Sequence, residues 1–313
     1  MQAMRDVWGQ SLADLASHDD RILVLDGDLA NSTKADRFAS THPARFLQMG
    51  IAEQNLVGAA VGLATLGFVP WLSSFAVFFT HRALDPVRML VAQTGANVKI
   101  AGAYAGLLTG LTGRTHQDVA DLAIMRSMPG MVVLSPADAA ECMQMVDWAS
   151  AYDGPVYLRL ARDGAPDLPM PDDRPFQLGA VRVLRHGAHA TLVSTGVQTT
   201  RVLEAADILH AEGVDVRVVH LPTVKPVDRH QLISATRDTP LVVSVEEHSV
   251  IGGLGGLLAE TLAAAPSAPL HRIGLDDLWT ESAPNDFLLD KYGLSAVRVA
   301  ARARQLVTSE GIV

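Results

Sequence analysis

One carboxylate stands out by its surroundings. Glu53 lies in the stretch QMGIAEQNLVGAAVGLATLGFVPWLSSFAVFF, residues 48–79, between an extended segment and a long run of small apolar residues. Its neighbours are apolar, with Ile51 and Ala52 before it and Leu56 behind it. A carboxyl group in apolar surroundings is suited to exchange a proton with a bound ligand. Glu53 is therefore the first candidate for catalysis. The alternative is an ordinary acidic residue at a helix start, stabilised by the helix dipole.

Other kinds of catalytic chemistry find little support. Cys142 is the only cysteine, which excludes an intramolecular disulfide and a cysteine-based zinc site, and there is no GxSxG nucleophile motif. His81 and Asp85 form at most an isolated pair, so we expect no metal site in this chain. The segment IGGLGG at 251–256 lacks both the GxGxxG pattern and a P-loop lysine. It predicts close packing at a helix start rather than nucleotide binding.

The elements that must position Glu53 alternate between strand and helix patterns. A helical pattern over residues 5–17 precedes the buried strand of RILVLDGDLANS, which breaks into a polar turn. Small residues at helical spacing follow Glu53 and predict a helix that ends at Gly67. Further strands and helices alternate at the same rhythm. The fold class we expect is α/β, with two doubly wound domains and mainly parallel sheets.

A change in composition marks the domain boundary. Residues 163–179, DGAPDLPMPDDRPFQLG, are rich in Pro, Asp and Gly, and the alternating pattern restarts after them. We therefore expect one domain at 1–165, a linker at 166–185 and a second domain at 186–313.

Composition also narrows the partners. The net charge of -9 and the absence of a Lys/Arg run argue against nucleic acid and anionic membranes. No apolar run approaches the length of a membrane span, which is about 20 residues. With one cysteine and no signal-like N-terminus, we expect a cytoplasmic protein.

The stretch around Glu53 resembles the pyrimidine-binding domain of transketolases. MRDVWGQSLADL, LDGDLANST, RTHQDVADLAIMRSMPGM, SPADAAE, VYLRLAR and TVKPVDR occur in the order usual for that family. VVSVEEHSVIGGLGG and DKYGLS resemble its C-terminal domain. The similarity covers essentially the whole chain, and IAEQN is its most specific motif.

The resemblance implies a thiamine diphosphate enzyme whose active site is shared between chains. Transketolases hold the diphosphate and a divalent metal through a GDG…N motif in a preceding domain, and this chain begins after that domain; DGDLAN near residue 26 lacks the later asparagine. We therefore expect the C-terminal-half subunit of a split transketolase. Its partner is an N-terminal-half subunit that holds the diphosphate and Mg or Ca. With a second copy of each chain, the assembly is a heterotetramer.

The resemblance also assigns roles to individual residues. Glu53 would share a proton with N1′ of the aminopyrimidine ring, and Phe75 and Phe78 would flank that ring. Asp28 would lie beside the cofactor, and its alternative role is helix capping. His116 would face the reacting hydroxyls of the substrate and take part in catalysis.

The substrate side combines matches and departures. Arg5, Ser32 and Arg162 fall where transketolases bind the sugar phosphate, and guanidinium groups suit a phosphate dianion. Tyr104 stands where the family usually has a histidine, and GLTG, with Thr112, replaces GEDG or GADG. We therefore expect donor or acceptor sugars that differ from the common ones.

The sequence predicts transfer of a two-carbon ketol unit from a ketose (phosphate) donor to an aldose acceptor. Two alternative enzymes share this two-domain arrangement: the beta subunit of a 2-oxoacid dehydrogenase E1 component, and an enzyme like deoxyxylulose-phosphate synthase. A non-catalytic assembly subunit is the alternative from another class.

Overall fold

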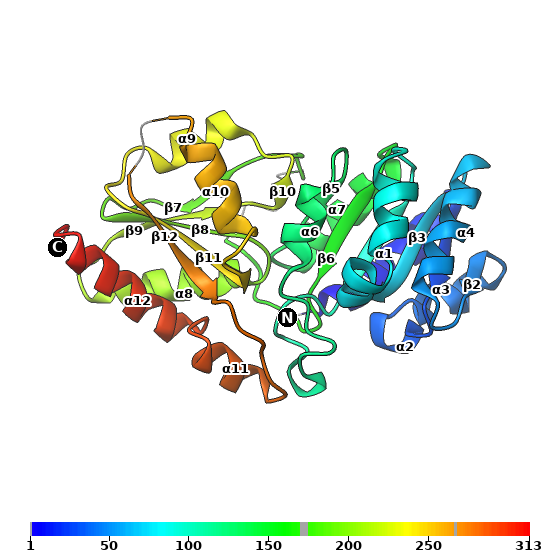
Figure 1. Cartoon of the computed structure of the whole chain (residues 1–313), viewed down its shortest axis with the longest axis horizontal. Helices are drawn as coiled ribbons and strands as arrows, with labels where there is room; N and C mark the ends of the chain where they lie inside the picture. Colours follow the sequence, from blue (N-terminus) through cyan, green and yellow to red (C-terminus); the bar gives the residue numbers. More distant parts are fainter. Residues whose placement is uncertain (1, 170–174, 266–267) are drawn as a thin grey trace.

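The chain forms two β-sheets, and helices cover both faces of each sheet (Figure 1). The computed structural model describes residues 2–169, 175–265 and 268–313. Residues 170–174 of the expected linker therefore lie outside the described residues. The α/β fold of two mainly parallel sheets is confirmed.

The first sheet has seven strands in the order β10-β5-β6-β4-β3-β1-β2. All neighbouring strands are parallel except β10, which is antiparallel to β5. The strand bounds are β1 Ile22–Asp26, β2 Phe46–Gln48, β3 Val69–Phe75, β4 Lys99–Ala103, β5 Val132–Leu134, β6 Val156–Leu160 and β10 Thr223–Lys225. The helices of this half are α1 Met4–Ala16, α2 Ala30–Thr33, α3 Asp36–Thr41, α4 Glu53–Thr65, α5 Leu84–Pro86, α6 Asp121–Ser127 and α7 Ala139–Ala151.

The second sheet has five strands in the order β12-β11-β8-β9-β7, of which β7 is antiparallel to β9. Its strands are β7 Arg182–Arg185, β8 Ala190–Ser194, β9 Val216–His220, β11 Val242–Ser249 and β12 Leu270–Leu275. Its helices are α8 Gln198–Ala211, α9 Arg229–Thr236, α10 Leu254–Leu262, α11 Asn285–Lys291 and α12 Ala296–Ser309.

Two strands lie where the sequence pattern does not place them. Strand β7 lies inside the segment 166–185 that we expected to be a linker, so the end of that segment belongs to the second sheet. Strand β10 comes from the second half of the chain but pairs with β5 of the first, through Thr223 opposite Leu134. The seven-stranded sheet is therefore completed by the C-terminal half.

The segment after β3 also departs from a regular helix. The pattern THRALDPVRMLVAQT predicts one helix, whereas the structure has two π-helical segments, η2 at Phe78–Arg82 and η3 at Val87–Ala92, joined by the short α5. Such π turns frequently occur at functional sites. Pro86 has no N–H to donate, which contributes to the break.

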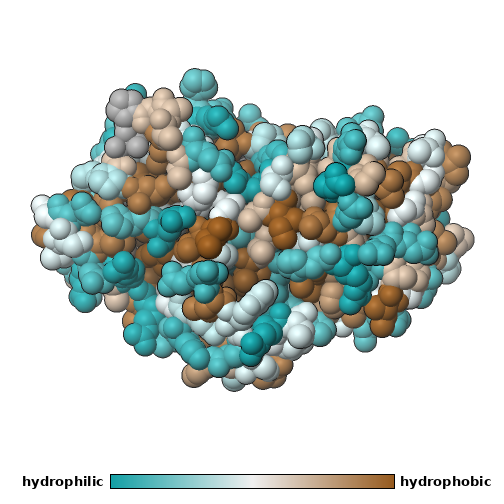
Figure 2. Space-filling model, in the orientation of Figure 1, coloured by the Kyte–Doolittle hydropathy of each residue, from teal (hydrophilic) through white to brown (hydrophobic). Residues whose placement is uncertain are grey.

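The core of the first half holds the strands that carry the site. All five residues of β1 are buried, and Trp71 of β3 packs on Trp8 of α1 with ring centroids 6.3 Å apart. On the face seen in Figure 2, polar and apolar residues are interspersed, and apolar patches lie near the middle, where the halves meet. No helix among the described residues is long and apolar enough to cross a membrane.

Candidate functional site

The candidate site lies where four neighbouring strands of the first sheet end. Strands β6, β4, β3 and β1 are adjacent in that order and parallel. Asp28 follows β1, Phe78 follows β3, Tyr104 follows β4 and Arg162 follows β6. Because the carboxyl ends of parallel strands share one edge of the sheet, four separate loops carry the predicted residues to one place.

Glu53 is the first residue of α4 and its side chain is fully buried. Its Oε1 accepts a hydrogen bond from Oγ of Ser74 at 2.9 Å, and its Oε2 pairs with Nη1 of Arg82 at 2.6 Å. A Cβ on Gly27 would come within 3.4 Å of Oε1, so glycine lets the loop after β1 approach the carboxylate. The carboxylate is thus bound by two polar side chains, one at each oxygen.

The surroundings of Glu53 correct the sequence analysis in one respect. The apolar neighbour Leu56 is buried as expected, but Ile51 is 71% exposed in this chain. Ser74 and Arg82 were not predicted as partners, because they lie 21 and 29 residues further along the chain. The carboxylate is therefore shielded by the fold and bound by polar groups, rather than enclosed by its sequence neighbours.

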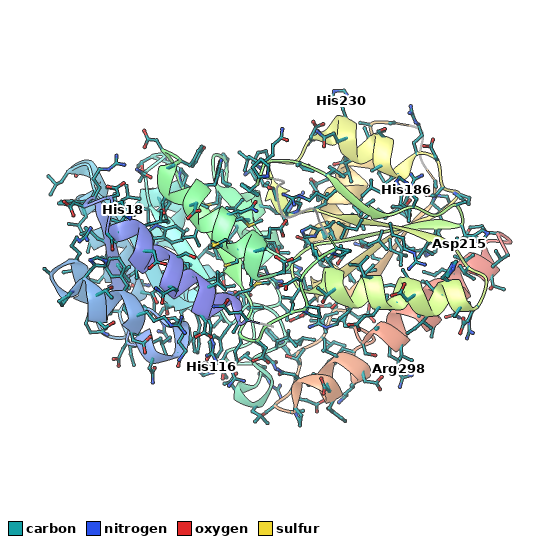
Figure 3. The ribbon with its side chains drawn as sticks, turned by 180° about the vertical axis from the view of Figure 1, so that it is seen from behind. His18, His116, His186, Asp215, His230 and Arg298 are labelled. Atoms are coloured by element: carbon teal, nitrogen blue, oxygen red, sulfur yellow. The ribbon has the colours of Figure 1, made fainter. Side chains whose placement is uncertain are left out.

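Aromatic rings form a continuous group beside this acid. Phe75 stacks on Phe78 with centroids 5.9 Å apart and on Tyr104 with centroids 4.1 Å apart. His116 meets both phenylalanines edge-on, at 5.9 Å from Phe75 and 5.6 Å from Phe78. The structure therefore brings the two phenylalanines and the histidine of the sequence prediction together, and Figure 3 shows His116 between the two halves.

A cationic cluster adjoins the aromatic group through Tyr104. Nη1 of Arg5 donates to the Tyr104 hydroxyl at 2.6 Å and to the backbone oxygen of Ser32 at 2.9 Å. The guanidinium carbons of Arg5 and Arg162 lie 5.5 and 5.6 Å from the Tyr104 ring centroid. Among the described carboxylates none pairs with either arginine. Two positive charges thus remain available to an anionic ligand.

Tyr104 and Asp28 share an unusual backbone conformation. Both have positive φ, 60° at Tyr104 and 66° at Asp28. For a bulky side chain this left-handed conformation is rare, and such residues cluster at functional sites. The Asp28 side chain is exposed and its N–H donates to Oε1 of Gln48.

Asp26, two residues before Asp28, is the buried acid of this loop. Burial raises its pKa above the ordinary value, and it accepts N–H groups from Leu29 and Ala30. These bonds hold the turn that presents Asp28 and Ser32, so local capping is done by Asp26 and not by Asp28.

Thr112 stands apart from the other predicted substrate residues. It is exposed on the short 3₁₀ turn η4, Gly110–Thr112, and its hydroxyl bonds to Thr109 within the same turn. This turn packs against α11 of the C-terminal half, where Ser282 donates to the Leu111 oxygen at 2.6 Å. The described contacts give Thr112 no link to the Arg5 and Tyr104 cluster.

A buried polar group below His116 was missed by the sequence analysis. Asp118 accepts a hydrogen bond from Thr80 of η2 at 2.5 Å, and burial with the nearby charge of Asp121 raises the pKa of Asp118 to about 7. Asp121 pairs with Arg159 at 2.8 Å, and Arg159 donates to the backbone of the C-terminal half. The position of Asp118 two residues after His116 was the one available signal.

The donor set fits the aminopyrimidine end of thiamine diphosphate. A flat nitrogen heterocycle needs an apolar face to stack on and a hydrogen-bonding group at its edge. Phe78 offers such a face, and the Arg82 guanidinium, which contacts both Phe78 and the Glu53 carboxylate, shows that one flat group can reach the two together. The described residues contain no group of three or more His, Cys, Asp or Glu side chains that could hold a metal.

Comparison with known families agrees with this architecture. Residues 1–166 match the transketolase pyrimidine binding domain, and residues 179–299 match the transketolase C-terminal domain. The chain therefore belongs to the transketolase family, whose members depend on thiamine diphosphate.

Individual relatives are similar to this chain over almost its whole length. A solved structure described as a split gene transketolase, inactive beta4 tetramer, is 43% identical, has a TM-score of 0.88 and is matched over 98% of both chains. The 6-deoxy-6-sulfo-D-fructose transketolase subunit of Clostridium sp. is 38% identical over 97% of this chain and 94% of its own. An apulose-4-phosphate transketolase subunit of Phocaeicola vulgatus is 33% identical over 98% of each chain.

Proposed function

We propose that this chain is one subunit of a split transketolase. In this role it transfers a two-carbon ketol unit from an anionic ketose donor to an aldose acceptor, with thiamine diphosphate shared between subunits. The observation that carries the proposal is the Phe75 ring, which contacts Phe78 beside Glu53 on one side and Tyr104 on the other. These ring contacts support a cofactor subsite at Phe78 and Glu53 that would adjoin an anion subsite at Tyr104.

Glu53 has the role of a proton partner. When bound, thiamine diphosphate supplies the nucleophilic carbon of the reaction. Glu53 would hold a proton at N1′ of the aminopyrimidine, with Ser74 fixing the second carboxylate oxygen. Phe75 and Phe78 would stack on or beside that ring and exclude water from it. Acid-base assistance of this kind is worth about 10²- to 10⁴-fold in rate.

Arg5 and Arg162 would bind the anionic end of the sugar. They approach the Tyr104 ring at similar distances, and Ser32 lies beside Arg5. A guanidinium pair recognises phosphate and sulfonate by the same charge-assisted hydrogen bonds. The relatives named for a sulfo-sugar and a sugar phosphate support an anionic substrate of this class. His116, at the edge of both phenylalanines, would contact the hydroxyls of the transferred unit.

The diphosphate and its Mg or Ca ion belong, in this proposal, to a separate N-terminal-half subunit. The split gene relative and the two relatives named as subunits support such a partner. Two copies of each chain would form a heterotetramer in the cytoplasm, with Asp28 and Thr112 lining the shared site. The chain by itself is then expected to be inactive.

The test is reconstitution with the chain that carries the diphosphate motif. We would measure ketol transfer between sugar phosphates and sugar sulfonates, and compare the wild type with Glu53→Gln. The amide keeps the shape of the side chain but removes its charge, so we expect at least a 10²-fold loss of kcat with the thermal midpoint of the complex retained.

Three results would contradict the proposal. Near-normal turnover of Glu53→Gln would remove the acid from catalysis. Carbon dioxide release from pyruvate, without ketol transfer, would indicate an E1-like or deoxyxylulose-phosphate-synthase-like enzyme. A complex that forms but binds no thiamine diphosphate would indicate a non-catalytic assembly subunit.

A further inference from the structure

Arg82 touches the same two groups that the proposed function assigns to the aminopyrimidine. Its Nη1 lies 2.6 Å from Oε2 of Glu53, and its guanidinium carbon lies 4.1 Å from the centroid of the Phe78 ring. A guanidinium is flat, rich in N–H donors and able to stack on an aromatic face. In these properties it resembles a protonated aminopyrimidine.

Building on the proposed function, we propose that Arg82 is an intramolecular competitor of the cofactor. In the free chain its guanidinium takes the pyrimidine position between Phe78 and Glu53, and thiamine diphosphate must displace it to bind. One face of Phe78 and one carboxylate oxygen cannot serve both groups at once. The affinity for the cofactor therefore includes the free energy of breaking the Arg82 contacts.

The buried charge of Glu53 in the chain without cofactor gives a reason for such an arrangement. Its side chain is fully buried, and a buried carboxylate without a partner is strongly destabilising. Because the proposed partner subunit holds the rest of the cofactor, this chain must fold before its acid meets the pyrimidine. Pairing with Arg82 compensates the charge in the meantime.

The position of Arg82 allows it to leave. It is the last residue of the π-helical segment η2, and its side chain is 40% exposed, so water can receive the charge. Its backbone is held in place, because Nε2 of Gln54 donates to its carbonyl oxygen at 2.9 Å. The side chain can therefore rotate away while the segment that carries Phe78 stays fixed.

Calorimetric titration of the reconstituted complex with thiamine diphosphate and Mg²⁺ tests this idea. If Arg82 fills the position for most of the time, Arg82→Ala should tighten the apparent Kd about tenfold. Arg82→Lys keeps the charge but loses the flat stacking surface, and should fall between alanine and wild type. The control is Arg88→Ala, since Arg88 is an exposed arginine of the next π-helical segment, η3, and pairs with Asp85. It should bind like wild type.

A second measurement addresses the free chain. Arg82→Ala should lower its thermal midpoint because Glu53 loses its counter-charge, and adding Glu53→Gln should restore most of the loss, as a double-mutant cycle detects. Unchanged or weaker cofactor binding by Arg82→Ala, with normal binding by wild type, would overturn the competition and make Arg82 a positioning residue. Absence of binding by the wild-type complex would overturn the proposed function as well.

Discussion

Phe75 and Tyr104 stack with ring centroids 4.1 Å apart and an angle of 20° between the rings. One residue ends β3 and the other follows β4, so the contact depends on the parallel register of these two strands, in which Phe75 lies opposite Ala103. Tyr104 reaches this position with a φ of 60°. A strained backbone is thus retained where the aromatic group meets the cationic cluster.

Tyr104→Phe separates the stacking of this ring from its hydrogen bond. Phenylalanine keeps the contact with Phe75 but removes the hydroxyl that accepts from Arg5. A net hydrogen bond contributes about 1 kcal/mol, so KM for an anionic donor should rise about fivefold while kcat is kept. Steady-state kinetics of the reconstituted enzyme measure both. If Tyr104→Leu, which also loses the stacking, behaves the same as Tyr104→Phe, the ring contact has no role.

Arg162→Ala should weaken binding of the anionic group of the substrate. Its guanidinium lies over the ring of Tyr104, which Arg5 also contacts, and hydrogen bonds to charged groups contribute about 1.5 to 3 kcal/mol. We expect KM for an anionic donor to rise about 10- to 100-fold, and KM for the same sugar without its anionic group to stay within about twofold.

Arg298→Ala is the matched control for Arg162→Ala. Arg298 pairs with Asp290 on the surface of the C-terminal half, away from His116 in Figure 3. Its removal should change neither KM. An equal increase in KM for charged and uncharged donors by Arg162→Ala would contradict anion recognition by Arg162.

The sequence predicts most of the fold because its strands are strongly patterned. The buried strand expected in RILVLDGDLANS is β1, and the helix expected to end at Gly67 is α4. Strands β2 and β10 have three residues each, too few for a period to show, and β10 is stabilised by a strand about 90 residues earlier. The π-helical turns η2 and η3 escape detection because each is about one turn long, too short for its period to be distinguished from that of an α-helix.

The candidate site also has residues that the sequence indicates and partners that only the structure shows. Glu53 was singled out by its apolar neighbours in the sequence, and its role, like those of Phe75 and His116, came from family resemblance and remains a prediction. The partners of Glu53 could not be found, because Ser74 and Arg82 meet it only through the packing of α4 on β3 and η2. The local hydrophobic pattern of a sequence indicates which residues are buried and whether a segment is a helix or a strand. Ion pairs between separate elements depend instead on the register of the sheet.

Asp118 predicts how stability changes with pH. Burial raises the pKa of Asp118 to about 7 from an ordinary 3.8, so the folded state holds a proton that the unfolded state releases between these values. The contribution of Asp118 to the free energy of unfolding is complete below about pH 4 and is lost as the pH rises through about 7. Between these two pH values the loss is about 1.4 kcal/mol per pH unit. The thermal midpoint of wild type should therefore decrease as the pH is raised from 5 to 7.

Asp118→Asn is the variant that tests this dependence. Asparagine resembles the protonated acid, so the variant should lose part of the slope while keeping its stability near pH 5. Glu246, whose pKa burial also raises to about 7, should supply the remaining slope. Asp290→Asn is the control, because its hydrogen bond with Arg298 lowers the pKa of Asp290 and places its effect below pH 4. An identical slope in Asp118→Asn and wild type between pH 5 and 7 would show that Asp118 is ionised throughout.

Glu247 couples the C-terminal half to the loop that carries the site. Its Oε1 accepts the N–H of Leu107 at 2.7 Å and of Leu108 at 3.3 Å, and its Oε2 pairs with Nη1 of Arg201 at 2.9 Å. The side chain is almost fully buried. Removing it leaves the two amides without their acceptor and Arg201 without its counter-charge, although Arg201 still donates to Oε1 of Gln198.

Glu247→Ala should therefore destabilise the chain by about 3 to 5 kcal/mol, as measured by urea unfolding. The lost bonds hold the backbone just after Tyr104, so the KM for an anionic donor should also rise when the complex is assayed below its unfolding temperature. Glu247→Gln keeps the shape and an acceptor for the amides, and should lose less stability. Glu260→Ala is the control, because Glu260 is an exposed acid of α10 that also pairs across the halves, with Arg126 of α6. A loss in Glu247→Ala no larger than in this control would show that the two halves do not depend on the buried contact.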